Sequence, residues 1–194
     1  MSKAILLNTG WTFTKEGHDE PVTLPHTWNA VDGQDGGNDY YRGTCSYTRK
    51  LEKPELSDGD RAVLQFDGVA MTAVVSLNGE KVAEHKGGYS TFRVDITDAL
   101  HDGANELIVS VDNSDNDTVY PQKADFTFYG GIYRDVSLMV VPKDHIALGH
   151  FGDTGVKITP ALKDGKADIR VETLVEGEGV LSVELLDAAG NIVA

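Results

Sequence analysis

Hydrophobic and polar residues alternate with a period of two along most of the chain, and the spacing of an amphipathic helix is almost absent. Residues 73–77 predict a strand, Asn78-Gly79 predicts a tight hairpin turn, and residues 81–85 predict the returning strand. The same alternation predicts further strands at residues 46–51, 62–66, 91–96, 107–111 and 136–140. Short, closely spaced strands of this kind predict an all-β fold built as an antiparallel β-sandwich.

Pro142-Lys143-Asp144 marks a boundary between two predicted units, residues 1–142 and residues 143–194. The second unit shows strand-like alternation at residues 156–159, 167–175 and 180–186. This pattern is typical of the first part of an immunoglobulin-like β-sandwich, a fold that needs about 100 residues. We therefore expect a partial immunoglobulin-like domain at this end and a chain that is truncated.

Charge and cysteine content narrow the possible partners. The formal net charge is −14, which repels nucleic-acid backbones and anionic membranes but leaves neutral sugars as plausible ligands. We therefore expect neither nucleic acid nor membrane as a partner. Cys45 is the only cysteine, so no intrachain disulfide is possible, and Asn8 interrupts the first apolar residues too early for a signal peptide. Both observations favour a cytoplasmic protein.

Residues 124–136 combine an isolated carboxylate, Asp125, with several aromatic residues and a Gly130-Gly131 bend that leads into a strand. A carboxylate accepts charge-assisted hydrogen bonds from sugar hydroxyls, so this segment suits a sugar-binding surface. The simpler interpretation, that Asp125 is a solvated loop residue ahead of an aromatic strand, stays open on the residues alone.

Two segments resemble the N-terminal domain of family-2 glycoside hydrolases, namely residues 77–92 with 95–97 and residues 125–136. Residues 24–29, 41–43 and 103–107 support the resemblance, which covers residues 10–142 in the order of the family. Intracellular-type β-galactosidases are the most similar members, and β-glucuronidases and β-mannosidases share much of the pattern. The resemblance implies a jelly-roll sugar-binding domain, then an immunoglobulin-like domain, then a (β/α)₈ barrel that lies outside this chain.

The resemblance also decides where catalysis takes place. Retaining glycosidases need two carboxyl groups about 5–5.5 Å apart, and in the family both belong to barrel glutamates. No residue of this chain is therefore assigned a catalytic role. We expect the non-catalytic N-terminal fragment of a retaining exo-β-glycosidase, most like a β-galactosidase, which supports and completes the barrel's sugar pocket and is inactive alone. The expected partners are a β-galactoside or related glycoside and the barrel of the same chain. The parent is expected to be a homo-oligomer that uses Mg²⁺ or Na⁺, with no cofactor in the fragment.

Sugar contacts are assigned by the resemblance to Asp125, Asn38 and Asp39. Asp125 is expected to reach into the barrel's pocket, hold hydroxyls of the terminal sugar and, in β-galactosidases, contribute to a monovalent-cation site. Asn38 and Asp39 lie in a polar, glycine-rich stretch from which the family places a second Asn or Asp on the sugar. Which of the two corresponds stays open, as does a plain connecting loop. The aromatic residues either stack on sugar rings or form a wedge between this domain and the barrel; they are Phe126, Phe128, Tyr129 and Tyr133.

No metal-binding motif is predicted. Asp112–Asp117 is as acidic as a calcium loop but lacks the glycine at position six and has Lys123 at position twelve, so we predict a turn-rich acidic loop. The histidines lack zinc spacing, and His26 and His85 are predicted to pack and hydrogen-bond inside the sandwich. Arg134-Asp135 are successive strand residues, so their side chains should point apart and have separate partners.

Two other functions fit the predicted fold. A freestanding carbohydrate-binding module requires measurable sugar affinity of this chain alone. A purely structural, adhesion-type sandwich fits the strands but not the Asp125 segment, and fold alone does not decide among them. The choice between galactosides, glucuronides and mannosides also stays open, because the selecting residues lie mainly in the barrel. The acidic loops offer few basic partners for a glucuronide carboxylate.

Overall fold

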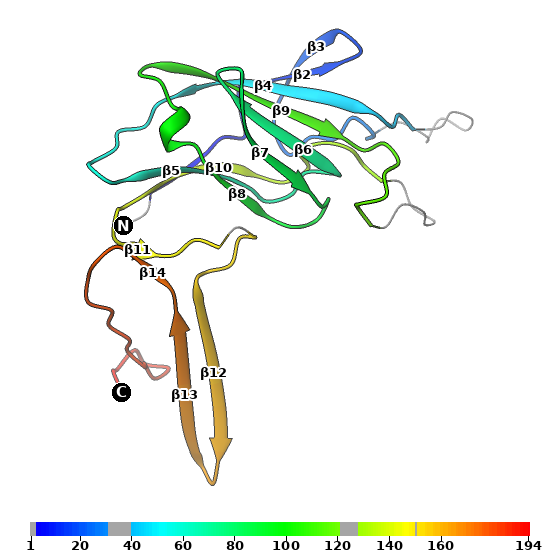
Figure 1. Ribbon diagram of the computed structural model, residues 1–194. Helices are drawn as coiled ribbons and strands as arrows, with labels where there is room; N and C mark the ends of the chain where they lie inside the picture. Colours follow the sequence, from blue (N-terminus) through cyan, green and yellow to red (C-terminus); the bar gives the residue numbers. More distant parts are fainter. Residues whose placement is uncertain (1–2, 31–39, 121–127, 150) are drawn as a thin grey trace.

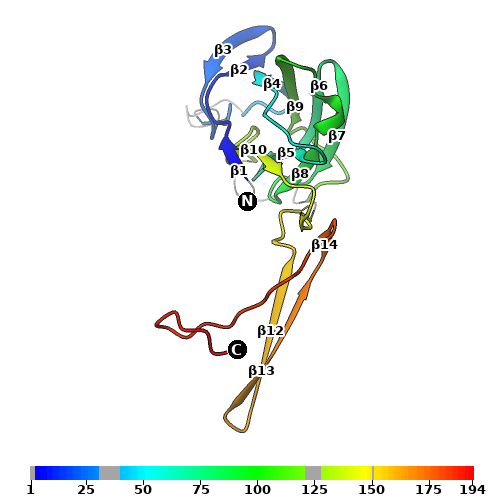
Figure 2. The ribbon, with the colours of Figure 1, turned by 90° about the vertical axis from the view of Figure 1, so that its left-hand side faces the viewer.

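The computed structural model describes residues 3–30, 40–120, 128–149 and 151–194, and these form two antiparallel β-sheets packed face to face, followed by a long hairpin (Figures 1 and 2). The four-stranded sheet has the order β1 (Lys3–Leu6), β10 (Val136–Val141), β5 (Arg61–Phe66) and β8 (Phe92–Asp95). The six-stranded sheet has the order β3 (His18–Val22), β2 (Trp11–Lys15), β4 (Thr44–Glu52), β9 (Ala104–Asp112), β6 (Thr72–Leu77) and β7 (Glu80–Lys86). A single 3₁₀ turn, η1 (Thr97–Ala99), is the only helical element of the described residues. The predicted all-β antiparallel sandwich is confirmed.

Strict alternation places the core between the two sheets. In β9, Leu107, Val109 and Val111 are fully buried, whereas the residues between them are partly exposed. Leu64 and Phe66 of β5 face them from the other sheet, since every second residue of a strand points to the same side. The alternating sequence therefore forms these strands because it supplies one continuous apolar face to each sheet.

The hairpin of β6 and β7 turns at Asn78-Gly79, both of which have positive φ, 54° and 84°. Two residues in this backbone region are what a type I′ turn requires, and the predicted turn is confirmed. The N-terminal strands β1, β2 and β3 were not predicted. The reason is clear for β3, an edge strand with four exposed residues, one of them Pro21, because such a strand carries no alternating apolar signal.

The residues after β10 form two further strand pairs. β11 (His145–Ile146) pairs with β14 (Val175–Glu176), and β12 (Val156–Lys163) pairs with β13 (Lys166–Thr173) in a hairpin that extends away from the sandwich (Figure 1). The strand predicted at 180–186 is wrong. Its residues are exposed and form no strand. Leu186 makes an isolated bridge to Ile192, because the chain turns back at residues 187–190 and Leu185 and Asp187 bond to residues 191–194. The immunoglobulin-like character of residues 143–194 stays a prediction.

Candidate functional site

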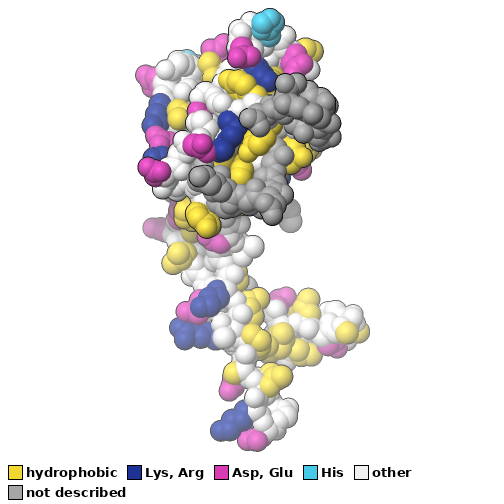
Figure 3. Space-filling model, turned by 90° about the vertical axis from the view of Figure 1, so that its right-hand side faces the viewer, with side chains coloured by type: hydrophobic (Ala, Val, Ile, Leu, Met, Phe, Trp, Pro, Cys, Tyr) yellow, Lys and Arg dark blue, Asp and Glu magenta, His cyan; other side chains and the backbone are white. Residues whose placement is uncertain are grey.

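The three predicted sugar contacts, Asn38, Asp39 and Asp125, lie outside the described residues, as does Phe126. The described residues that flank them come from four positions in the chain: Ala30 and Tyr40 on either side of the first stretch, and Tyr120 and Phe128 on either side of the second. The geometry of the site is therefore built from these flanking residues. Figure 3 shows this end of the sandwich, where hydrophobic, basic and acidic side chains lie close together.

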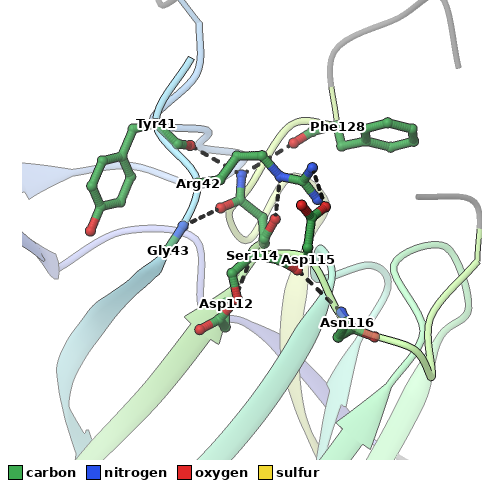
Figure 4. A network of polar contacts seen from close by, with 9 residues as sticks. Tyr41, Arg42, Gly43, Asp112, Ser114, Asp115, Asn116 and Phe128 are labelled. Carbon is green, nitrogen blue, oxygen red and sulfur yellow. Dashed lines mark hydrogen bonds and ion pairs between the residues drawn. The ribbon is translucent and has the colours of Figure 1, made fainter. Parts of the chain in front are cut away.

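Two fully buried asparagines, Asn29 and Asn113, join the flanking segments. The side-chain nitrogen of Asn113 donates to Asn29 Oδ1 at 3.2 Å. It also donates to Phe128 O at 3.2 Å and to Tyr41 O at 3.3 Å, and Asn113 Oδ1 accepts from the backbone amide of Gly43 at 2.9 Å (Figure 4). Asn29 donates to Tyr41 O at 2.9 Å and accepts from the Gly130 amide at 2.7 Å. Buried backbone groups need such partners, so this network fixes the backbone on the C-terminal side of both undescribed stretches.

Sequence reasoning missed both asparagines as a pair, although a signal existed for one of them. Asn113 follows Val109 and Val111 of β9 at the same spacing of two, so the alternation that places these valines in the core also turns Asn113 inward. No comparable signal marks Asn29. Its partners are backbone atoms far away in the sequence, such as the Gly130 amide, and no local pattern specifies them.

The Gly130-Gly131 bend is required by close packing. A Cβ on Gly130 would lie 2.0 Å from the Trp28 indole, and one on Gly131 would lie 2.4 Å from the carbonyl oxygen of His26. Gly131 also has a φ of 137°, which side-chain-bearing residues rarely adopt. Thr27 donates its hydroxyl to Gly130 O at 2.8 Å, which holds the bend against the segment of Trp28. The two glycines thus serve the contact between residues 26–29 and 130–132.

Arg42 connects the loop after β9 to the same place. Its Nη1 lies 2.6 Å from Asp115 Oδ1, and its Nε donates to Asn113 O at 2.9 Å (Figure 4). The guanidinium also lies 5.7 Å from the Phe128 ring centre and 5.9 Å from that of Tyr40, within the range of cation–π attraction. The Arg42 guanidinium is consequently held by the Asp115 carboxylate and by the rings of Phe128 and Tyr40.

The acidic loop that begins at Asp112 is a series of turns, as predicted. The Asp112 carboxylate accepts hydrogen bonds from the Ser114 amide and hydroxyl and from the Thr44 hydroxyl, and Asn116 Oδ1 accepts from the Thr118 and Val119 amides. Burial raises the pKa of Asp112, but the hydrogen bonds from Ser114 and Thr44 outweigh burial and lower it overall. Donors from the loop (Ser114) and from β4 (Thr44) thus satisfy this carboxylate.

The aromatic residues of the segment divide into buried and exposed ones. Phe128 is buried, in a small cluster with Ala70, Met71 and Val119, so it neither stacks on a sugar nor forms an exposed wedge. Tyr133 is half-buried, donates its hydroxyl to Gly88 O, and has a pKa raised by burial. Tyr129 is 43% exposed and is the described member of the group that stays open to either interpretation.

His26 and His85 pack and hydrogen-bond as predicted, and Arg134 and Asp135 have separate partners, although both precede β10 and are not strand residues as expected. His26 Nδ1 lies 2.8 Å from the Tyr47 hydroxyl, and burial lowers the pKa of His26 although Glu20 opposes this shift. His85 is buried and stacks on Phe92 with ring centres 4.2 Å apart. Arg134 donates to the carbonyls of Asp67 and Tyr89, whereas Asp135 accepts from Asn8.

In the part of the chain that the structure describes, no group of His, Cys, Asp and Glu is arranged to hold a metal ion, and no helix is long and apolar enough to cross a membrane.

Residues 2–142 match the model of the glycosyl hydrolases family 2, sugar binding domain. The chain belongs to this family. It is 40% identical over 158 residues to a beta-glucuronidase of Bacteroides fragilis, covering 78% of this chain and 23% of that protein. It is 31% identical over 190 residues to a beta-galactosidase of Thermoanaerobacter pseudethanolicus, covering 95% of this chain and 25% of that protein. The structure of a Bacteroides uniformis beta-glucuronidase matches with a TM-score of 0.81 and 33% identity, over 90% of this chain and 22% of that one. The chain thus spans about a quarter of the length of the curated relatives it matches.

Proposed function

We propose that this family-2 chain is the N-terminal, non-catalytic part of a retaining exo-β-glycosidase, in which the sandwich supports and completes a sugar pocket. The catalytic carboxyl pair lies in the remainder of the parent protein, within a (β/α)₈ barrel. Asp125 supplies hydrogen-bond acceptors to the terminal sugar, and Asn38 or Asp39 supplies a second contact. The chain alone does not hydrolyse glycosides.

The observation that carries this proposal is the buried network of Asn29 and Asn113. Its hydrogen bonds reach the backbone at Tyr41, Gly43, Phe128 and Gly130. These residues follow the predicted contact residues within a few positions of the sequence. A sugar contact must be held in a fixed position to contribute to binding, and loops anchored by buried hydrogen bonds provide this.

The substrate has two candidates. A β-galactoside follows from the sequence motifs, and the relative named beta-galactosidase at 31% identity supports it. A β-glucuronide is favoured by the higher identity, 40%, to a relative named beta-glucuronidase. Mg²⁺ or Na⁺ as a cofactor of the parent, homo-oligomeric assembly and a cytoplasmic location complete the proposal.

The test is kinetic and uses the full-length parent. Asp125→Asn keeps the shape of the side chain but removes the charge. It should lower kcat/KM, and the loss corresponds to about 1.5–3 kcal/mol of transition-state binding, the contribution of one charged hydrogen bond. Asp117→Asn is the matched control, because Asp117 is exposed and lies in the neighbouring acidic loop. Nitrophenyl β-galactoside and β-glucuronide, assayed side by side, identify the substrate. Equal kcat/KM in the parent and Asp125→Asn would remove the sugar-contact role.

The freestanding carbohydrate-binding module is tested by calorimetry on this chain with galactose, lactose and glucuronate. Binding by the isolated chain would favour the module. No binding, together with hydrolysis by the parent, is the result expected here.

A further inference from the structure

The outer face of the four-stranded sheet is the place where the residues after β10 meet the sandwich (Figure 1). On edge strand β8, Phe92 and Val94 are buried in the core, so Arg93 and Asp95 project from the opposite, outer face. On the paired strand β5, Gln65 lies opposite Arg93 and Val63 lies opposite Asp95. Val63 faces outward and is nevertheless buried, which indicates that the following segment covers this face.

Arg93 holds that segment with its guanidinium. Its Nη1 donates to Gly149 O at 3.0 Å and to Asp153 O at 2.9 Å, and its Nε donates to Gln65 Oε1 at 2.8 Å. Gln65 in turn donates to Asp67 Oδ1 at 2.8 Å, which fixes the orientation of its amide. One side of the guanidinium is therefore attached to the sheet, while the other binds two carbonyls 56 and 60 residues further along the chain.

The Gly149–Asp153 turn is shaped to fit against β8. The Gly152 amide donates to Gly149 O at 3.1 Å and closes the turn, with Gly152 at a φ of 80°. A Cβ on Gly152 would lie 2.6 Å from Thr91 Cγ2, so the turn approaches the strand more closely than a side chain would allow. Phe151 adds a ring contact with His85 at 6.4 Å between ring centres. The turn leads directly into β12 and so into the hairpin.

The space next to the turn is lined mainly by charged and polar side chains. A cleft of about 250 Å³ lies between the sheet and β11, and Arg61, His145 and Glu176 are among the residues that line it. Because side chains do not fill this space, burial alone does not fix the hairpin relative to the sandwich. Hydrogen bonds from a charged donor to neutral carbonyls are directional and stronger than neutral ones.

We propose that Arg93 locks the Gly149–Asp153 turn onto the sandwich and so sets the direction in which the β12–β13 hairpin leaves it. Without the Arg93 side chain, the chain pivots at residues 142–145 and the hairpin samples many directions. The proposal concerns this chain alone and does not depend on the sugar pocket.

The test measures the distance between spin labels on Glu80→Cys, at the turn of β6 and β7, and Lys163→Cys, at the end of β12, in the 194-residue chain. Cys45 is buried and should not take a label, which the chain without the added cysteines checks. Arg93→Met removes the donors and keeps most of the stem. Arg170→Met is the matched control, because it makes the same change of charge at a residue whose side chain bonds to Glu172 on its own strand and, in the described part of the chain, to nothing on the sandwich.

A narrow distance distribution is expected for the labelled 194-residue chain with Arg93 intact and for Arg170→Met, and a broad one for Arg93→Met. Amides of residues 147–149 and 151–155 should also exchange with solvent at least about tenfold faster in Arg93→Met, because the two hydrogen bonds from the charged donor to Gly149 O and Asp153 O are lost. Gly152→Ala lifts the turn from Thr91 without touching Arg93 and should broaden the distribution too, which keeps the test valid if Arg93→Met folds poorly. The proposal would be overturned by a narrow, unshifted distribution in both Arg93→Met and Gly152→Ala, or by a broad distribution in the labelled 194-residue chain with Arg93 intact.

Discussion

Replacing Asn113 by alanine tests whether the buried network carries the stability of this edge of the sandwich. The change leaves the Phe128 carbonyl, which is buried, without the donor it has now, and leaves the Gly43 amide without its acceptor. Tyr41 O keeps the hydrogen bond from Asn29, and Asn29 Oδ1 keeps that from Gly130. Of the four groups that bond to the Asn113 side chain, Tyr41 O and Asn29 Oδ1 thus keep a second hydrogen bond, and the loss falls mainly on the Phe128 carbonyl and the Gly43 amide.

The magnitude follows from these two groups. A buried polar group left unsatisfied costs about 1–3 kcal/mol, and the Gly43 amide belongs at the low end because Gly43 is only half-buried. We expect Asn113→Ala to lower the free energy of unfolding by about 2–4 kcal/mol, a large share of the about 5–15 kcal/mol of a whole domain. Asn116→Ala, in the same loop, is the control because Asn116 bonds to residues two or three positions away.

The assay is urea unfolding followed by the fluorescence of Trp11 and Trp28, both buried in the sandwich. The midpoint should fall and the slope should stay constant, since the surface exposed on unfolding is unchanged. Hydrogen exchange of the Gly43 amide should accelerate more than that of core strand β9. A loss below about 0.5 kcal/mol, or one no larger than that of Asn116→Ala, would refute the reasoning, because surface changes are of that size.

Three further predictions rest on other contacts. Gly130→Ala should cost about 1–3 kcal/mol or more in chemical unfolding because its Cβ would overlap Trp28, whereas Gly179→Ala, with open space around it, should be neutral. Burial lowers the pKa of His26, so as the pH falls the unfolded chain takes up a proton at a higher pH than the folded chain, and stability should fall below about pH 6.5. His26→Gln should reduce this loss of stability when unfolding midpoints at pH 8 and pH 5.5 are compared. Leu162→Lys with Ile169→Lys should reduce self-association in sedimentation velocity, because both side chains are exposed on the apolar face of the β12–β13 hairpin, whereas Thr159→Lys on the other face should not.

The sequence predicted those elements whose cause is local. The β6–β7 hairpin follows from alternation on both sides of Asn78-Gly79, and β9 follows from its three buried apolar positions. The β12–β13 hairpin was predicted for the same reason. Its alternation produces one apolar face, on which Ile158 lies opposite Val171 and Leu162 opposite Ala167. That face is exposed along the hairpin, so alternation alone did not guarantee burial (Figure 3).

What the sequence did not predict depends on contacts between distant segments. The strand expected at 180–186 has suitable alternation but joins no sheet among the described residues, which alternation alone does not reveal. Asn113 lay inside a stretch interpreted only as an acidic loop, although its buried amide organises the site. A buried asparagine and a solvated one look the same in a sequence when the partners are backbone atoms of other loops.

The motif at residues 124–136 therefore combines residues that packing requires with one residue proposed to contact the sugar, and the sequence alone does not separate the two. Gly130 is required by Trp28, Gly131 by the backbone of His26, and Phe128 by the cluster with Met71. These three would be needed in a sandwich that never meets a sugar, so their presence identifies the fold and the family more than the chemistry. The sugar-contact role consequently depends on Asp125 itself. Because Asn113→Ala perturbs the anchoring and Asp125→Asn changes only the carboxylate, the two variants separate these two roles. Asn113→Ala should lower stability and kcat/KM together, because the anchored backbone positions the sugar contacts, whereas Asp125→Asn should lower kcat/KM and leave stability unchanged.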